Sequence, residues 1–183
     1  LVELAIENGI AVTAAPGPVA AITGLILSGL TAGRFVFEGF LPMNKRSRKE
    51  RISTFKNESR TIIFYEAPHK LLYTLKDLFD ALGERNIVLA RELTKKFEQL
   101  VRCTLSEAIN MYTENPPKGE FVLMLEGTKE EAILETKRRK WEDMSLAEHV
   151  NMYVGQGLSK KEAMKKVSED RGISKRDVYN ALV

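Results

Sequence analysis

The stretch TIIFYEAPHKLLYTLKDLFDALGERNIVLA, Thr61–Ala90, decides the fold class of this 183-residue chain. Its opening residues, Thr61–Tyr65, are β-branched and aromatic, which is typical of a strand. Apolar residues then recur on one helical stripe over positions 71–82, and Gly83 ends that helix. The apolar run Asn86–Ala90 predicts a second, buried strand. A strand, a helix and a strand in this order indicate an α/β domain.

The alternation continues on both sides of this stretch. Short apolar, β-branched or aromatic runs predict further strands at Ile10–Ala14, Arg34–Glu38, Glu98–Cys103 and Phe121–Leu125. Helical periodicity, charge and stop signals predict further helices at Leu1–Asn8, Val19–Leu30, Lys45–Lys56 and Leu105–Tyr112. The pattern from Gly33 to Gly127 indicates an α/β domain with a mixed sheet.

The end of the chain repeats one helix-start signal. A serine followed three residues later by an acid occurs at Ser145…Glu148, Ser159…Glu162 and Ser174…Asp177. The serine hydroxyl can accept a hydrogen bond from a backbone N–H of the first turn, and the acid can accept one from the backbone N–H of the serine. Each spacing therefore predicts a helix start. Gly157 and Gly172 supply tight turns between these starts, and a small three-helix, helix-turn-helix-like domain is expected.

Composition excludes several classes of protein. With 44% hydrophobic and 29% charged residues, the chain is globular, and its net charge of +3 means that a polyanion would need a local basic patch. The single cysteine, Cys103, excludes a disulfide framework and fits a reducing compartment. No apolar run reaches membrane-spanning length, and no P-loop, G-x-S-x-G elbow or Cys/His metal spacing is present.

Four ordered segments carry a family resemblance: AAPGPVAAITGLILSGL (Ala14–Leu30), RFVFEGFLP (Arg34–Pro42), TIIFYEAPHKLLYTL (Thr61–Leu75) and ARELTKKFEQLVRCTLSE (Ala90–Glu107). A fifth, PPKGEFVLMLEG (Pro116–Gly127), follows in the same order. Together they resemble the tetrapyrrole-methylase superfamily. The YEAPHK and ARELTK pair is similar to its ribosomal RNA branch, whose members 2′-O-methylate a cytidine of small-subunit ribosomal RNA.

This resemblance implies an S-adenosylmethionine-dependent methyltransferase that acts on ribosomal RNA, as a homodimer in the cytoplasm. It divides the chain into the remnant of an N-terminal α/β domain (1–31), a C-terminal α/β domain (32–128), a linker helix (129–143) and a small helical domain (144–183). Leu1 is not a methionine, and Leu1–Asn8 looks like the second half of a helix. Since the family's glycine-rich cofactor strand would lie before Leu1, we expect the fragment alone to be inactive.

The resemblance also assigns the cofactor contacts. Most of them follow the carboxyl end of a strand, where open α/β sheets bind ligands, and the last three open the final strand. The set comprises Pro16, Gly17, Pro18, Tyr65, Glu66, Ala67, Leu93, Glu120, Phe121 and Val122. The backbone of 120–122 is expected beside the adenine. Taken alone, Pro16–Pro18 is equally a plain turn, and 120–122 is equally the start of a core strand.

Two carboxylates are candidate catalytic groups. Glu66 could favour a sulfonium cation or take the proton of a ribose hydroxyl, and Glu92 could orient that hydroxyl. The alternative for Glu66 is a residue that satisfies donors at a helix start. The alternative for Glu92 is an Arg–Glu ion pair within the domain.

Basic residues are the candidates for RNA contact. They are Lys45, Arg46, Arg48, Lys49, His69, Arg91 and Lys95. Such side chains suit phosphates, although charged helices are more often solvated faces. His149 is expected on the surface of the helical tail, and the tail docks either on RNA or on a partner subunit.

Two other functions stay open. A methylase acting on a tetrapyrrole macrocycle would share the fold and the cofactor without needing a basic helix. A non-catalytic RNA-binding module would need no cofactor.

Overall fold

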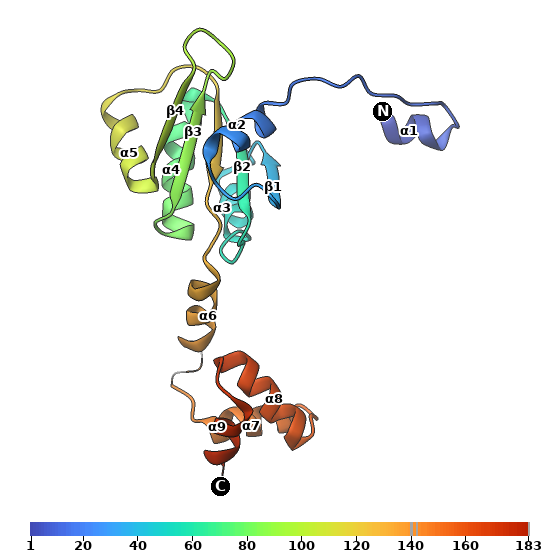
Figure 1. Cartoon of the computed structure of the whole chain (residues 1–183), viewed down its shortest axis with the longest axis vertical. Helices are drawn as coiled ribbons and strands as arrows, with labels where there is room; N and C mark the ends of the chain where they lie inside the picture. The colour runs from blue at the N-terminus through green and yellow to red at the C-terminus, as the bar shows by residue number, and fades with distance from the viewer. Residues whose placement is uncertain (140, 142, 183) are drawn as a thin grey trace.

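A five-stranded sheet forms the centre of the protein in the computed structural model, which describes residues 1–139, 141 and 143–182 (Figure 1). The strands are β1 (Phe35–Gly39), β2 (Thr61–Glu66), β3 (Asn86–Arg91), β4 (Gln99–Thr104) and β5 (Phe121–Leu125), in the order β1-β2-β5-β3-β4. β1 and β2 are parallel and every other pair is antiparallel. The predicted α/β fold with a mixed sheet is confirmed.

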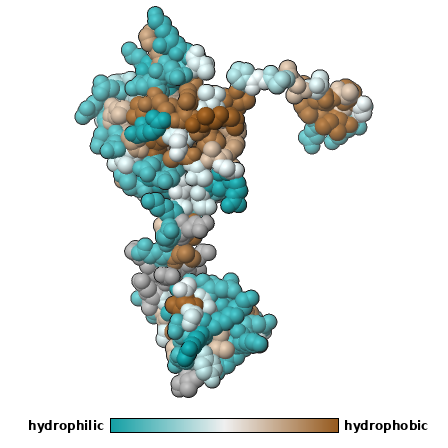
Figure 2. Space-filling model, in the orientation of Figure 1, coloured by the Kyte–Doolittle hydropathy of each residue, from teal (hydrophilic) through white to brown (hydrophobic). Residues whose placement is uncertain are grey.

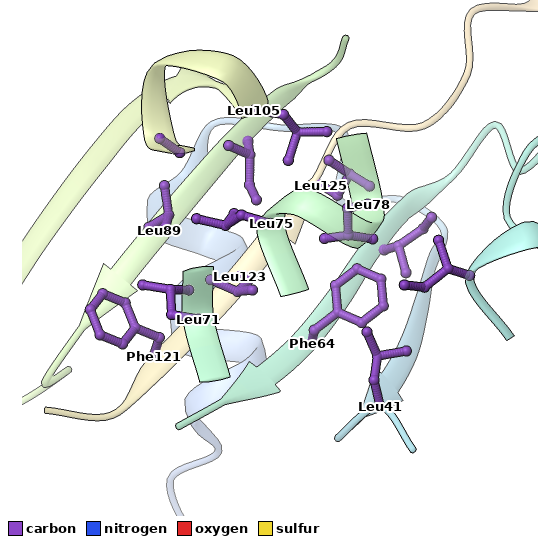
Figure 3. Packing of buried hydrophobic residues seen from close by; sticks show 14 of the residues in the cluster. Leu41, Phe64, Leu71, Leu75, Leu78, Leu89, Leu105, Phe121, Leu123 and Leu125 are labelled. Atoms are coloured by element: carbon purple, nitrogen blue, oxygen red, sulfur yellow. The ribbon is translucent and has the colours of Figure 1, made fainter. Parts of the chain in front are cut away.

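One face of the sheet carries the larger core. Alternate strand residues such as Phe64, Leu89 and Leu123 point to this face, as the two-residue period of a strand requires. Leucines from α4 (Pro68–Leu82) pack on them (Figure 3). Residues of α3 (Lys45–Ser53) and α5 (Leu105–Glu114) complete the cluster.

The other face is covered by α2 (Ala20–Ser28). Ala21 and Leu25 of this helix pack on Ile63, Val88 and Met124. A Cβ added at Gly24 would lie 3.1 Å from the sulfur of Met124, so this glycine lets the helix lie close to β5. The outer side of α2 stays apolar and exposed, which Figure 2 shows as hydrophobic surface over this part of the sheet.

The segment before α2 differs from the prediction. α1 (Val2–Glu7) forms and ends at Asn8 as expected, but it has no buried residue. The strand predicted at Ile10–Ala14 is wrong: these residues are exposed and have no strand conformation. A strand needs a neighbour to pair its N–H and C=O groups, and no strand of the described residues lies beside this segment.

Most other boundaries shift by one or two residues. α3 ends at Ser53 rather than Lys56, because Thr54, Phe55 and Lys56 each donate to the carbonyl three residues back and tighten the last turn. α2 begins at Ala20 and is closed by Gly29 in the left-handed conformation.

Helices α6 (Glu130–Arg139), α7 (Leu146–Gly155), α8 (Lys160–Arg171) and α9 (Lys175–Asn180) follow the sheet. All three predicted serine caps form reciprocal capping boxes. Val150, Ala163, Val167 and Val178 form the core of the last three helices. The predicted linker 129–143 includes positions 140 and 142, which lie outside the described residues.

His149 is buried, so its predicted surface position is wrong. Its ring stacks between Trp141 and Tyr153, with centroid distances of 3.9 and 5.3 Å. Arg171 Nε donates to His149 Nδ1 over 3.1 Å. Burial, followed by the charge of Arg171, lowers the pKa of His149. Tyr153 lies one turn along the same helix, but Arg171 comes from α8, and this distant partner could not be predicted from the spacing of residues in the sequence.

No helix among the described residues is long and apolar enough to cross a bilayer.

Candidate functional site

A cavity of about 370 Å³ opens at one edge of the sheet. β5 runs antiparallel to both β2 and β3, so β2 and β3 end at the same edge, where β5 begins. The register aligns Glu66, Arg91 and Phe121 across this edge. The cavity is lined by Ala20, Phe40, Tyr65, Glu66, Ala67, Ala90, Glu92, Leu93, Lys95, Glu120, Phe121 and Val122.

The lining contains every predicted cofactor residue outside the first turn: Tyr65, Glu66, Ala67, Leu93, Glu120, Phe121 and Val122. The turn Pro16–Pro18 is exposed and does not line the cavity. The helix that follows it does reach the site, because Ala20 lines the cavity and the Ala21 N–H donates to Tyr65 Oη over 3.1 Å.

Aromatic rings form one wall. Tyr65 makes edge contacts with Phe37 and Phe40, at centroid distances of 5.2 and 5.7 Å. Phe40 follows β1 and is 67% exposed, so its ring lies at the mouth. Neither Phe40 nor Ala90 was among the residues predicted for the site, and Ala90 carried no signal beyond its strand.

Glu66 is a buried carboxylate with both oxygens in use. Thr74 Oγ1 donates to Oε2 over 2.6 Å, and the Ala67 N–H donates to Oε1 over 2.9 Å. These bonds hold the carboxylate at the start of α4. The predicted alternative, in which Glu66 satisfies hydrogen-bond donors at a helix start, is therefore observed. Glu66 also lines the cavity, so both interpretations of this residue apply.

Glu92 ties the loop after β3 to the residue before β5. Its N–H donates to Glu120 O over 3.0 Å, and its Oε1 accepts from the Glu120 N–H over 2.8 Å. These contacts place Glu92 in the left-handed region, with φ of 50°. The Glu120 N–H, followed by Lys95, lowers the pKa of Glu92.

Gly119 makes this approach possible. It has φ of 82°, and a Cβ there would lie 2.6 Å from Glu92 Cγ. A side chain at 119 would therefore displace the Glu92 carboxylate.

Lys95 shares its charge between two acids. Its Nζ lies 3.3 Å from Glu92 Oε1 and 3.0 Å from Glu120 Oε2. Hydrogen bonds to Glu120 and Glu92 raise the pKa of Lys95. The predicted Arg–Glu ion pair is not formed by Glu92 among the described residues, because Glu92 pairs with Lys95 instead. Arg91 instead reaches Gln99 Oε1, over 3.4 Å.

The basic helix is partly neutralised. Arg46 pairs with Glu50 at 2.9 Å, and Arg48 pairs with Asp77 of α4 at 2.7 Å. Arg48 is mostly buried and fixes α3 to α4, so its charge is committed within the fold. Lys45 and Lys49 are exposed, with no ion pair among the described residues, and His69 is exposed outside the cavity lining.

Comparison with known proteins adds to this geometry. The family model for tetrapyrrole (corrin/porphyrin) methylases matches residues 1–109. The ribosomal RNA small subunit methyltransferase I of Halalkalibacterium halodurans is 46% identical over 180 residues, which are 98% of this chain and 62% of that protein. The protein of the same name from Bacillus subtilis is 44% identical over 91% of this chain and 56% of its own length. The chain therefore spans about three fifths of these relatives.

A solved structure shares the fold. The crystal structure of the methyltransferase CobJ matches with a TM-score of 0.52 and 18% identity, over 69% of this chain and 56% of that one. At this identity the likeness concerns the fold alone.

Proposed function

Because the chain belongs to the tetrapyrrole (corrin/porphyrin) methylase family, we propose that it forms part of an S-adenosylmethionine-dependent methyltransferase. The proposed reaction is 2′-O-methylation of a cytidine ribose in small-subunit ribosomal RNA. The names of the relatives support the substrate. The observation that carries the proposal is the cavity in which the residues after β2, after β3 and before β5 converge.

The lining fits a cationic cofactor. Its volume lies within the range of small-molecule sites. Glu66, Glu92 and Glu120 outnumber Lys95 in the lining, so their charges favour a sulfonium cation. Phe40 and Tyr65 offer ring faces to an adenine. S-adenosylmethionine supplies a methyl group that its sulfonium already activates.

The main chain at the start of β5 has limited capacity for the adenine edge. The Glu120 N–H and C=O are both bonded to Glu92. Phe121 and Val122 are paired in the sheet with β2 on one side and β3 on the other. The proposed contact of 120–122 with the cofactor is therefore mainly packing against the base.

The two carboxylates take different roles in the proposal. Glu92 Oε2 has no hydrogen bond among the described residues, so it can accept one from the ribose hydroxyl and orient it. The lowered pKa of Glu92 makes it a weak proton acceptor. Alignment can still lower the barrier by roughly 7–11 kcal/mol. Glu66 is ascribed the electrostatic role beside the sulfonium.

Phosphates of the RNA are assigned to the predicted basic residues of α3 and of the loops beside the cavity. Lys45 and Lys49 of α3 are exposed, and Arg46 is 88% exposed at its side chain despite its pair with Glu50. Arg91, Lys95 and His69 stay assigned to the RNA that approaches the mouth. Arg48 contributes indirectly, by holding α3 in place.

The proposal extends to the organisation of the protein. We assign 1–31 and 32–128 to the two methylase domains, 129–143 to a linker helix and 144–183 to a helical domain. We also propose a cytoplasmic homodimer.

Calorimetric titration with S-adenosylmethionine, which carries the sulfonium charge, tests the cofactor site. It is done on this chain and on the full-length protein that its gene encodes, together with Glu66→Gln. Glu58→Gln, which alters a partly buried carboxylate paired with Arg60 outside the cavity, is the control. We expect the full-length protein to bind more tightly than the chain, and Glu66→Gln to weaken binding about tenfold. Absence of binding by both proteins would refute the assignment.

Transfer of a tritiated methyl group to small ribosomal subunits then tests the substrate. If the protein methylates a corrinoid precursor and does not methylate small ribosomal subunits, it is a tetrapyrrole methylase rather than a ribosomal RNA methyltransferase.

A further inference from the structure

α8 and α9 form a helix-turn-helix unit. α8 ends at Gly172, which has the left-handed φ of 59° and ψ of 37°. Ile173 packs into the tail core, and Ser168 Oγ donates to its carbonyl over 2.7 Å. Ser174 then caps α9. The turn is short and held at both ends, so α9 has a defined orientation on α8.

The outer face of α9 combines cations with an aromatic ring. Val178 is fully buried, whereas Lys175, Arg176 and Tyr179 are exposed and, because Tyr179 lies three or four residues from the two cations, share one side of the helix. Tyr179 is 58% exposed, although an aromatic ring contributes most when buried. The two cations precede it by four and three residues, so their side chains flank the ring.

These two charges are available. Neither Lys175 nor Arg176 forms an ion pair within the part of the chain that the structure describes. On α8, by contrast, Lys165 and Lys166 lie 3.9 and 3.8 Å from Glu169 and Asp170. The one acid of α9, Asp177, has an oxygen bonded to the N–H and hydroxyl of Ser174.

We propose that the face formed by Lys175, Arg176 and Tyr179, here called the α9 face, binds the single-stranded part of a structured RNA. Lysine and arginine contact phosphates, and an exposed ring stacks on an unpaired base. Phosphates supply the negative charge that these two cations lack among the described residues, and an unpaired base supplies a stacking partner for the ring, so RNA meets both features at once. The inference rests on the proposed function, whose substrate is ribosomal RNA, and assigns the tail to substrate affinity.

Binding of the full-length protein to small-subunit ribosomal RNA, measured by fluorescence anisotropy over a range of salt concentrations, tests this inference. Tyr179→Ala should lower affinity at least about fivefold, whereas Tyr179→Phe should retain it because the ring remains. The double variant Lys175→Ala/Arg176→Ala should reduce the slope of log Kobs against log salt by about 1.4–1.8. The matched control is Lys165→Ala/Lys166→Ala, which removes the same charge from paired positions.

The outcomes separate the inference from the function. Equal RNA affinity for the wild type and all α9 variants would overturn the inference and leave the methyltransferase assignment intact. An altered sedimentation coefficient in the α9 variants with unchanged RNA affinity would also overturn it, in favour of a subunit contact. Circular dichroism of each variant confirms that the tail is folded. Cofactor binding, measured separately, reports on the methylase site alone.

Discussion

The loop after β3 shows how a single residue shapes the cavity. Glu92 and Thr94 both have positive φ, at 50° and 64°, although neither is a glycine. Such conformations cost free energy and persist where surrounding contacts enforce them. Here the enforcing contacts are those of Glu92 with the backbone of Glu120, and Gly119 leaves the space for them.

Substitution at Gly119 separates this contact from ordinary backbone strain. Gly119→Ala should destabilise the protein by about 1–3 kcal/mol and weaken S-adenosylmethionine binding by the full-length protein about tenfold, because it displaces the Glu92 carboxylate. Gly83→Ala is the matched control, since Gly83 has φ of 73° but no atom within 4 Å of a Cβ. It should cost stability without reducing cofactor affinity. Equal loss of affinity in both variants would contradict the role given to the Glu92 contact.

At the scale of elements, α7 and α8 are joined by a buried polar cluster. His149 of α7 accepts from Arg171 at the end of α8, and its Nε2 lies 3.6 Å from Asp170 Oδ2. Tyr153 donates to the same carboxylate oxygen over 2.5 Å, and burial with this bond raises the pKa of Tyr153 to about 12. The neutral imidazole suits this arrangement, because a protonated Nδ1 could not accept from Arg171.

The cluster predicts a pH-dependent tail. Since the pKa of His149 is lowered in the folded protein, the unfolded chain binds more protons, and stability falls as the pH drops below the ordinary histidine value near 6.5. Thermal unfolding, followed by the fluorescence of the single tryptophan, should show a lower Tm at pH 5.5 than at pH 7.5. His149→Phe should remove this difference, whereas a variant of the other histidine, His69→Gln, should keep it. A difference that survives in His149→Phe would assign it to another group.

At the scale of the molecule, the sheet and the helical tail have separate cores. The two clusters on the sheet share no residue with the cluster of α7, α8 and α9. Figure 1 shows the tail joined to the sheet through α6. Cores that are not shared can unfold independently, so the whole chain need not behave as one cooperative unit.

Calorimetry of two core variants tests this division. Leu75→Ala should destabilise the transition of the sheet by roughly 2–5 kcal/mol and leave that of the tail unchanged. Val167→Ala should lower the transition of the tail alone. A single transition that both variants shift would show that the sheet and the tail unfold together.

The amount of site information in the sequence differed between residues. Segments that leave a strand and enter a turn, such as Tyr65–Ala67 and Glu92–Leu93, were selected and do line the cavity. Phe40 and Ala90 were not selected, because one lies in the loop that follows β1 and the other is an ordinary strand residue. Pro16–Pro18 was selected by resemblance, yet the described chain places no other segment over it.

Residues close together in the sequence determined where the helices begin and end. Capping boxes at Ser145, Ser159 and Ser174 depend on neighbours within a few residues, so the sequence alone was sufficient. Tertiary structure decided what depends on distant partners. It left Ile10–Ala14 unpaired and buried His149 between Trp141 and Tyr153. It also committed Arg48 to Asp77, because burial and ion pairing depend on distances in space that spacing along the chain does not specify.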